Sequence, residues 1–544
     1  VEIEGKVKFM TSCNNAVEEG MVVYTNSPRL RLARRRTVQM ILSQHDCKCA
    51  TCVRSRNCSL QTLANDLNIT DIPYGERLEF QEWDRSFPLI RDSQKCIKCM
   101  RCVQVCDKIA GLGIWALEGT GARSTINVSG SRTIAEADCS LCGQCITHCP
   151  VGALKERDDT EEFLKAVADP KKVVVVQVAP AVRTAWGEEL GIAPDEATVG
   201  KIFDTLRKIG ADYVFDTAFS ADLTIMEEAS EFIARFSNGE LKEKPMFTSC
   251  CPGWVRFLKS NYPHLTAQLS SAKSPMQMFG AVMKTHFAKE IGVDPENIYS
   301  VAVMPCVAKK GERNMEFFFE EYAGHDTDCV LTTRELVRMI KAFHILPKTL
   351  SDAQPDRLFH DVTGAGIIGA TGGVMEAALR TAYYSLMGEN CPPDAFKVVR
   401  AQSQETGLTE ATFSLNDIDL HIAVVNGLAN TRKLIEEIDR GEKKYDFVEV
   451  MACPGGCVGG GGQPIHDGEE LAFTRGKKLY FLDKNANIRH SHENPDIKTL
   501  YKNYFGTPNS HKAHQVLHTD HFAWEMPKRL LRDKDGYIIR ERRI

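Results

Sequence analysis

The chain has 544 residues, of which 43% are hydrophobic and 26% charged, close to the averages of globular proteins. This length predicts three or more domains, and the composition argues against disordered, collagen-like and coiled-coil classes. A net charge of -5 gives no support for a nucleic acid or an anionic membrane as partner, and no apolar run approaches the ~18 residues of a membrane-spanning helix. The unusual number is 20 cysteines, whose two- and three-residue gaps suit metal ligation better than disulfide bridges.

The first 30 residues hold one cysteine, Cys13. It fits the last ligand of a plant-type [2Fe–2S] cluster whose other three cysteines would precede Val1. Residues 1–30 are therefore expected to be the remnant of such a domain. The cluster itself is expected only if upstream residues are present.

Residues 31–75 contain one imidazole and three thiols in the pattern His45-x3-Cys49-x2-Cys52-x5-Cys58. A lone histidine is usually structural, but its place beside three spaced cysteines predicts a [4Fe–4S] cluster with one His and three Cys ligands. A Cys3His zinc site is the alternative, and Cys47 is left as a spare thiol. Because imidazole carries no charge, the potential of this cluster should differ from that of an all-cysteine neighbour.

A doubled cysteine motif occupies residues 86–157. It reads Cys96-x2-Cys99-x2-Cys102-x3-Cys106 and then Cys139-x2-Cys142-x2-Cys145-x3-Cys149-Pro150, the arrangement of bacterial two-cluster ferredoxins. In that arrangement the fourth cysteine of each run ligates the other cluster. The pattern predicts two [4Fe–4S] clusters, against two zinc sites as the alternative. Their expected ligands are Cys96, Cys99, Cys102 and Cys149 for one, and Cys139, Cys142, Cys145 and Cys106 for the other.

Strand-like and helix-like segments alternate after a charged, helix-forming connector at 158–169, which predicts an α/β domain over residues 170–518. Unbroken apolar runs predict buried strands at 173–178, 299–303, 421–425 and 447–450. Loops beyond the carboxyl ends of such strands form the ligand crevice of open α/β sheets. A buried cofactor pocket is therefore expected there, near loop residues such as Pro180, Met304, Pro305 and Met451.

Three segments far apart in this domain carry the remaining clustered cysteines: Thr248-Ser249-Cys250-Cys251-Pro252, Met304-Pro305-Cys306-x2-Lys309-x2-Glu312 and Met451-Ala452-Cys453-x-Gly455-Gly456-Cys457. Since a cubane needs four thiolates, Cys251, Cys306, Cys453 and Cys457 could converge on one more [4Fe–4S] cluster. Cys250 is left over, and a thiol beside a metal site is a candidate proton carrier. Because it follows the Met304-Pro305-Cys306 loop, Lys309 is expected to be a buried ammonium that faces an anion and takes part in catalysis; a surface lysine is the alternative.

These three segments resemble the signature loops of the [FeFe]-hydrogenases, and the front end resembles their multi-cluster clostridial type. The resemblance implies ferredoxin-like iron–sulfur domains followed by a two-lobed α/β catalytic domain, an α/β and α+β multidomain fold with the cofactor between the lobes. It implies an H-cluster, in which the cubane shares the thiolate of Cys457 with a two-iron unit carrying CO, cyanide and azadithiolate. The residues expected to line this cofactor are Pro180, Ala181, Met304, Pro305, Met451 and Gly369.

The resemblance also implies a proton path. It runs from Cys250 through Glu228 and Ser270 to Glu231 and Arg235. The two glutamates and the arginine fall in a predicted amphipathic helix over residues 223–236. Exposed charge on a helix is usually only solvated, so the path depends on partial burial that raises the carboxyl pKa values.

The expected function is therefore reversible hydrogen chemistry, with electrons exchanged through the front clusters with ferredoxin or flavodoxin. One alternative is the catalytic subunit of an electron-bifurcating, NAD-linked hydrogenase whose flavoprotein subunits are other chains. Another is an iron–sulfur assembly factor or hydrogen sensor without turnover. The many thiolate clusters and the absence of a visible signal favour a cytoplasmic location.

Three pocket positions differ from the clostridial pattern, at Ala181, Met276 and Ile368. Each removes a hydrogen-bond donor or aromatic bulk beside the expected two-iron unit, so altered potential, catalytic bias or oxygen sensitivity is expected. The basic tail, residues 519–544, extends beyond the resemblance. It is expected to clamp the catalytic domain or to bind a partner subunit.

Overall fold

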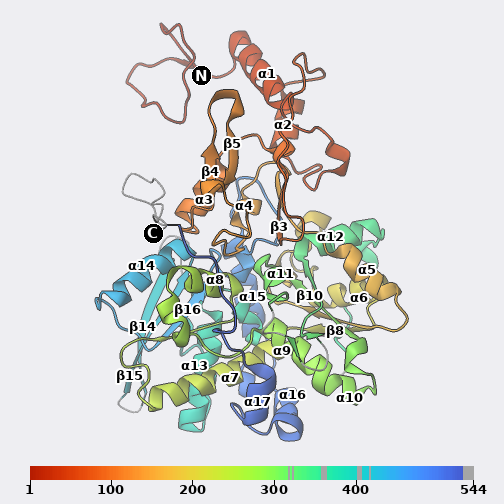
Figure 1. Ribbon diagram of the computed structural model, residues 1–544, viewed down its shortest axis with the longest axis vertical. Coiled ribbons are helices and arrows are strands. Elements are labelled where there is room, and N and C mark those ends of the chain that lie inside the picture. Colours follow the sequence, from red (N-terminus) through yellow and green to blue (C-terminus); the bar gives the residue numbers. More distant parts are fainter. Residues whose placement is uncertain (316–318, 321–323, 357–363, 401–406, 416–417, 531–544) are drawn as a thin grey trace, which may run out of the picture.

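The structure is a computed structural model that describes residues 1–315, 319–320, 324–356, 364–400, 407–415 and 418–530. A narrower N-terminal part stands on a larger α/β part, with the N-terminus at the far end of the narrow part (Figure 1). Within the described residues, no helix combines the length and apolar character needed to cross a membrane.

The outermost segment begins with a short antiparallel pair, β1 (Glu2–Ile3) and β2 (Val23–Tyr24). Helix α1 (Pro28–Leu42) starts with proline, and the Leu30 N–H donates to the Ser27 hydroxyl at 3.2 Å. Proline has no N–H to leave unsatisfied, so this cap and this first residue together fix the helix start. Helix α2 (Ser59–Asp66) follows.

The next unit contains the doubled cysteine motif. Its elements are the antiparallel pairs β3 (Leu89–Arg91) with β6 (Leu154–Glu156) and β4 (Trp115–Glu118) with β5 (Thr125–Val128), and the helices α3 (Arg101–Lys108) and α4 (Gln144–Thr147). Lys98 and Leu141 occupy equivalent positions of the two cysteine runs, and both have left-handed backbone angles. The two loops therefore turn in the same way around their cysteines.

The first sheet of the large part is fully parallel, in the order β13-β10-β7-β8. Its strands are β7 (Val173–Val178), β8 (Tyr213–Asp216), β10 (Ile298–Met304) and β13 (Cys329–Thr332). Helices α5, α6 and α12 contribute to the apolar core on one face. Helices α9, α16 and α17 contribute to the core on the other face, as expected for strands buried on both faces.

The second sheet has the order β14-β15-β16-β9. It contains β9 (Met246–Phe247), β14 (Leu408–Leu415), β15 (Ile418–Asn426) and β16 (Phe447–Met451), and only the β14–β15 pair is antiparallel. Helices α7 and α13 share an apolar core with this sheet. A two-stranded pair, β11 (Phe319–Glu320) with β12 (Gly324–His325), lies outside both sheets.

The predicted fold class is confirmed, and all four predicted buried strands are present, one with the predicted bounds and the others with one to four additional residues. The remaining helices of the large part are α5 (Thr160–Ala168), α6 (Val199–Ile209), α7 (Ala218–Ser237), α8 (Pro252–Asn261), α9 (Pro275–Val282), α10 (Ala288–Glu290), α11 (Ala308–Glu312), α12 (Thr333–Ala342), α13 (Gly373–Met387), α14 (Leu428–Asp439), α15 (Ala472–Lys484), α16 (Pro495–Leu500) and α17 (His511–Leu517).

The iron–sulfur unit and the α/β part share one continuous apolar core. Leu141 from the second cysteine run packs in the same cluster as Trp254 of α8 and Val307 beyond β10. Backbones also meet directly, since a Cβ added to Gly461 would lie 2.5 Å from the Gly143 Cα. The two glycines therefore permit a contact that a side chain at either position would prevent.

We predict that Gly461→Ala lowers the unfolding temperature, because its methyl group would overlap the Gly143 backbone. Overpacking of this kind costs about 1–3 kcal/mol. Scanning calorimetry of the cluster-loaded protein measures the change. Gly75→Ala is the control, because a Cβ there meets no atom within 4 Å, and its unfolding temperature should equal that of the wild type. Equal temperatures for all three proteins would contradict the close contact.

Candidate metal and catalytic site

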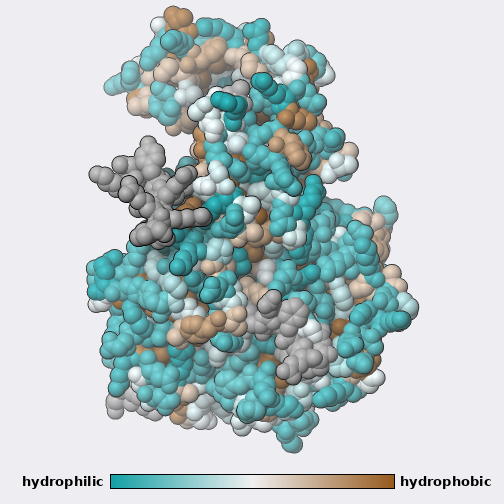
Figure 2. Space-filling model, in the orientation of Figure 1, coloured by the Kyte–Doolittle hydropathy of each residue, from teal (hydrophilic) through white to brown (hydrophobic). Residues whose placement is uncertain are grey.

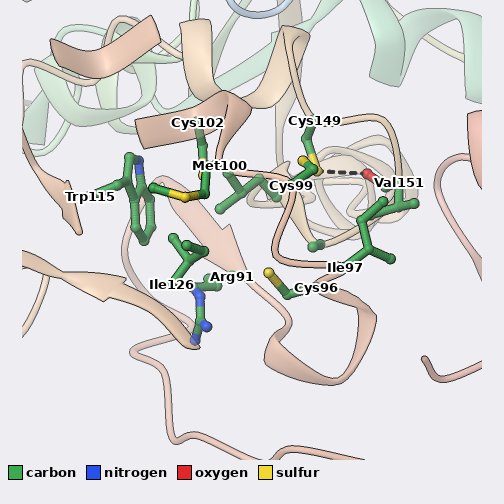
Figure 3. Close-up of a pocket in the computed structure, with 12 residues that line it drawn as sticks. Arg91, Cys96, Ile97, Cys99, Met100, Cys102, Trp115, Ile126, Cys149 and Val151 are labelled. Atoms are coloured by element: carbon green, nitrogen blue, oxygen red, sulfur yellow. Dashed lines mark hydrogen bonds between the residues drawn. The ribbon is translucent and has the colours of Figure 1, made fainter. Parts of the chain in front are cut away.

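Cys96, Cys99, Cys102 and Cys149 surround a small cavity (Figure 3). The thiol of Cys149 donates to the Val151 carbonyl at 3.0 Å, and the buried Arg91 also lines this space. Burial and the neighbouring Cys149 raise the pKa of Cys102 to about 12. Such a group of thiols is a donor set for a cluster, whose iron would lower the proton affinity that burial raises.

Cys106, Cys139, Cys142 and Cys145 line a second small cavity. Backbone N–H groups point at two of these sulfurs, from Ile114 to Cys106 and from Leu141 to Cys139, both at 3.4 Å. N–H···S bonds of this kind tune cluster potentials. The structure thus brings together the two cysteine groups that the crossed spacing predicted, while their ligation remains a prediction.

His45 is buried, and its Nδ1 lies 3.0 Å from the Lys95 carbonyl. A ring that donates through Nδ1 leaves the Nε2 lone pair for a metal. Burial raises the pKa of the Cys49 thiol, and the nearby thiols of Cys58 and Cys52 raise it further. This group adjoins the first ferredoxin cavity, since a Cβ on Gly152 would lie 2.5 Å from the Cys52 sulfur.

Two further thiols, Cys47 beside the His45 group and Cys13 in the first segment, are not among the expected ligands of these groups. Cys47 is exposed and donates to the His45 carbonyl at 3.3 Å, while Cys13 is exposed in the first segment. Among the described residues, no three His, Cys, Asp or Glu side chains converge in the geometry of a single metal ion.

The fourth cysteine group lies where strands of both sheets end. Cys251 follows β9, Cys306 follows β10, and Cys453 and Cys457 follow β16. Burial and the neighbouring Cys306 and Cys251 raise the pKa of Cys453 well above its usual value. Burial and the same two thiols also raise the pKa of Cys457. Cys453 is buried and the other three thiols are half-buried, and four thiols that affect one another in this way are a suitable donor set for a cubane.

This fourth group lies directly against the second ferredoxin cavity. The Cys453 sulfur is 3.7 Å from the Cys142 carbonyl oxygen, and Gln144 donates to the Gly459 carbonyl at 2.9 Å. The His45 group therefore adjoins the first ferredoxin cavity, and the fourth group adjoins the second.

Glycines shape the space beside Cys457. A Cβ on Gly456 would lie 2.8 Å from the Thr371 nitrogen, and one on Gly369 would lie 3.2 Å from the Ala181 Cβ. The Ala181 carbonyl accepts from the Gln463 amide at 2.9 Å. The turn around residue 369, the loop after β7 and the loop around Cys457 are therefore in close backbone contact.

The other residues expected at the cofactor are buried in the same region. Met304 and Met451 are at most 3% exposed, and Pro180 and Pro305 are also buried. Met276 is 1% exposed, and its carbonyl accepts from Gln177 at 2.9 Å. Ile368 packs against the same apolar cluster as Cys250, Cys251 and Cys457. Two of the three differing positions, Ile368 and Ala181, therefore adjoin loops of the site. Residues 357–363, before this turn, lie outside the described residues.

The sequence did not identify Glu449 as a site residue. Its carboxylate is buried and accepts the N–H groups of Gly372 and Met375, each at 2.7 Å. Burial raises its pKa to about 7 although those N–H groups oppose the shift. Glu449 thus ties β16 to the start of α13, beside the turn that carries Gly369. Only its position two residues before Met451 could have drawn attention to it.

Lys309 is buried, as one of the two alternatives required. Its ammonium pairs with Glu312 at 2.7 Å and donates to the Cys250 carbonyl at 3.2 Å. Burial opposes the charge, but Glu312 outweighs this effect and the pKa of Lys309 is raised. An ammonium has three donors, so one remains for an anionic ligand in the pocket. These residues fit a cubane with an attached anionic metal unit.

Glu228 is buried on α7, and its carboxylate accepts the Ser249 N–H at 3.4 Å. Ser270 lies close to this carboxyl, and its hydroxyl opposes the rise in the pKa of Glu228 that burial causes. Burial, followed by the nearby Glu231, raises the pKa of Glu228 to about 8. Glu228 also lies close to Cys250. Burial is the main cause that raises the pKa of the Cys250 thiol, and the neighbouring Glu228 is the second. Glu228 is therefore neutral at pH 7 and can donate a proton.

Glu231 lies one turn further along the helix, nearer the surface. Its carboxylate accepts from the Ser270 hydroxyl at 2.8 Å and from the Ser271 N–H at 3.0 Å. Arg235 pairs with it at 3.4 Å and also donates to the Leu269 carbonyl at 3.2 Å. The five residues expected to form the proton path are thus brought together, although proton transfer along them remains a prediction.

Comparison with known proteins agrees with this geometry. Residues 172–461 match the family model of the iron-only hydrogenase large subunit, C-terminal domain, and residues 469–524 match that of the iron hydrogenase small subunit. The first match covers more than half of the chain. The chain belongs to the iron-only, or [FeFe], hydrogenase family. It is therefore an oxidoreductase acting on hydrogen.

The front of this hydrogenase resembles parts of respiratory enzymes. Residues 34–73 match the NADH-ubiquinone oxidoreductase-G iron-sulfur binding region, and residues 88–155 match the ferredoxin-like domain of NADH-quinone oxidoreductase subunit 3. Iron–sulfur clusters in the front domains and an H-cluster in the catalytic domain are family properties.

Similar proteins include the NADP-reducing hydrogenase subunit HndD of Solidesulfovibrio fructosivorans, 44% identical over 96% of this chain and 90% of the relative. Iron hydrogenase 1 of Clostridium pasteurianum is 39% identical over 95% of this chain and 90% of its own. A variant of the [FeFe]-hydrogenase HydA1 from Chlamydomonas reinhardtii superimposes with a TM-score of 0.60 at 39% identity, over 68% of this chain and all of that one.

We predict that the infrared spectrum at pH 7 contains the C=O stretch of a protonated Glu228, which Glu228→Gln removes and which titrates near pH 8. Between about pH 4.5 and 8 the folded protein holds this proton and the unfolded chain releases it. The contribution of Glu228 to the free energy of unfolding should therefore fall as pH rises through this window, and the variant should lose that dependence. The exposed Glu240→Gln is the control. A band unaffected by Glu228→Gln would refute the assignment.

Proposed function

We propose that the chain catalyses the reversible reaction of two protons and two electrons to form H2, at an H-cluster held by Cys251, Cys306, Cys453 and Cys457. The observation that carries this proposal is a spare thiol, Cys250, beside that cysteine group and close to a buried carboxyl, Glu228, that is neutral at pH 7. When bound, the H-cluster supplies electrons and an open iron site for H2. The chain supplies the ligands, the pocket and the proton route.

On this proposal, Cys250 exchanges a proton with the pocket and Glu228 restores it. Glu228 is suited to this role because a carboxyl with a pKa near 8 can both give and accept a proton close to neutral pH. Ser270 links it to Glu231, whose carboxylate is partly exposed and held by Arg235. Lys309 orients an anionic ligand of the two-iron unit through its third donor.

Electrons pass between the front of the chain and the catalytic cubane. We propose a [4Fe–4S] cluster at each of the three front groups, in the domains 31–75 and 86–157, and a [2Fe–2S] cluster at Cys13 only with further upstream residues. The contacts of Gly152 with Cys52, and of Cys142 with Cys453, support this order. Both contacts lie between adjacent groups, as single-electron transfer requires.

Three observations favour a place in a hetero-oligomer that exchanges electrons with a pyridine nucleotide on another chain. A similar protein is named an NADP-reducing hydrogenase subunit, and the front domains match parts of NADH oxidoreductases. Exposed large apolar side chains also concentrate in the first 40 residues, at the top of Figure 2. They are Val7, Phe9, Val17, Val22, Val23, Tyr24, Leu32 and Met40. Direct exchange with ferredoxin or flavodoxin in the cytoplasm remains the first expectation.

A role in iron–sulfur assembly without turnover is the alternative of another class. The cytosolic iron-sulfur assembly component 3 of Bos taurus is 30% identical over 83% of this chain. The proton route and the Lys309–Glu312 pair argue for catalysis instead, since an assembly function has no need of them.

We predict that Cys250→Ala retains all its clusters but turns over at least ~100-fold more slowly, because it lacks the thiol that exchanges protons with the pocket. The chain would be loaded with the synthetic two-iron cofactor under anaerobic conditions. Infrared bands of metal-bound CO and cyanide then report assembly, and H2 evolution is assayed on the same sample. Cys391→Ala, which removes another buried thiol, should evolve H2 like the wild type. Near-normal turnover in Cys250→Ala would refute the relay, and a wild type without CO and cyanide bands would favour the assembly role.

We predict that the isolated chain evolves H2 from reduced ferredoxin and that NADPH or NADH supports evolution only when flavoprotein subunits copurify. Assaying both donors, before and after removal of the copurified subunits, measures the difference. If the rate of H2 evolution from reduced ferredoxin is the same with and without the copurified subunits, the single-chain function is supported. Failure of ferredoxin as donor, with nucleotide-driven activity in the complex, would support the hetero-oligomer.

A further inference from the structure

The segment after α17, residues 517–524, lies along the segment that carries Ser270; we call it the C-terminal strap. The Thr519 N–H donates to the Ser271 carbonyl at 2.8 Å, and the Lys273 N–H donates to the Leu517 carbonyl at 2.8 Å. Ala272 and His518 form an antiparallel bridge between these bonds. The strap thus pairs with residues 270–273 as a short strand would.

Two buried histidines of the strap reinforce this pairing. The Nε2 of His521 donates to the Ser270 carbonyl at 2.8 Å, and the Nδ1 of His518 lies 2.8 Å from the Ser271 hydroxyl. Both residues are 8% exposed. The strap therefore contacts Ser270 at its backbone carbonyl, and Ser271 at both its backbone carbonyl and its hydroxyl.

The same two serines hold Glu231. The Ser270 hydroxyl and the Ser271 N–H both donate to its carboxylate, at 2.8 and 3.0 Å. These bonds fix the carboxylate in reach of Ser270, the link toward Glu228. A displacement of the serine segment would consequently displace the outer carboxylate of the proton route, although no strap side chain touches Glu231 in the described contacts.

His518 is itself fixed from its other side. Its Nε2 lies 2.9 Å from Glu227, a carboxylate with no exposed surface. Glu227 also accepts from the Asn509 N–H at 2.7 Å and from the Tyr501 hydroxyl. Adjacent residues on a helix point about 100° apart. Glu227 accordingly faces the strap while Glu228 faces Cys250, and α7 connects the two.

The far end of the strap is anchored on α8. The Lys259 ammonium donates to the carbonyls of His521 and Trp524 and lies 4.0 Å from the centre of the Trp524 ring. A cation over an indole face is an attractive contact. The strap is thus held at both ends, by Glu227 through His518 and by Lys259.

We propose that the C-terminal strap positions the outer half of the proton route, with His518 as its principal positioning residue. The strap transfers no proton itself. It fixes Ser270 and Ser271 so that their donors hold Glu231 in line. This inference rests on the proposed relay, so its test includes a variant of the relay.

The test compares His518→Ala, Glu231→Gln and the double variant, each loaded with clusters and the two-iron cofactor. His518→Ala is expected to lower H2 evolution about tenfold, a barrier increase of about 1.4 kcal/mol, and to raise the solvent deuterium isotope effect. Infrared and electron paramagnetic resonance spectra of the clusters should be unchanged. The double variant should be no slower than Glu231→Gln alone, because the strap acts through Glu231. His511→Ala, which removes an exposed imidazole from α17, is the control.

Each outcome decides between the strap and the relay. If Glu231→Gln evolves H2 slowly but His518→Ala evolves it at the wild-type rate, the proposed role of the strap is wrong and the relay is retained. A fast Glu231→Gln overturns both. If the rate effects of His518→Ala and Glu231→Gln multiply in the double variant, or if His518→Ala leaves the isotope effect unchanged, His518 contributes to stability alone. Either result also overturns the proposed role of the strap. If His518→Ala does not fold, Ser271→Ala removes the same hydrogen bond while keeping the His518–Glu227 pair, and the same criteria apply.

Discussion

Thiols that would repel one another as thiolates lie together in the interior, and this constraint organises the rest of the molecule. Burial raises the pKa of Cys453, Cys457 and Cys102, and neighbouring thiols raise it further. An ionised group moved into the interior costs several kcal/mol, which bound iron can offset. Folding and cluster binding are therefore coupled, and the elements that bring the cysteines together are strand ends and tight turns with little freedom to relax.

Close backbone contact is the second requirement, because neighbouring clusters must adjoin without side chains between them. Gly143 meets Gly461, and Gly152 meets the Cys52 sulfur. An apolar core that includes Leu141, Trp254 and Val307 surrounds the first of these contacts. The iron–sulfur unit is consequently packed on the catalytic part as one body, and its position relative to the catalytic cubane does not depend on a flexible linker.

Local patterns were sufficient for much of this. Unbroken apolar runs gave the buried strands, because a strand covered on both faces needs apolar side chains throughout, and cysteine spacing gave groups that line common cavities. Glu449 and the Glu227–His518 pair could not be found in this way. Each is a carboxylate whose partner lies 74 to 291 residues away, so its burial follows from the tertiary fold alone. The burial of Lys309 was expected from its place after the Met304-Pro305-Cys306 loop, and the structure confirms it.

The strap also has a consequence for the order of assembly. A chain is synthesised from its N-terminus, so Ser270 leaves the ribosome about 250 residues before His518 and His521. The iron–sulfur domains and both sheets can form while the serine segment still lacks its partner strand. Maturation thus has a natural sequence, in which electron carriers are built first and the proton route is closed last. A nascent or C-terminally clipped chain would hold clusters and conduct electrons before it could turn over at full rate.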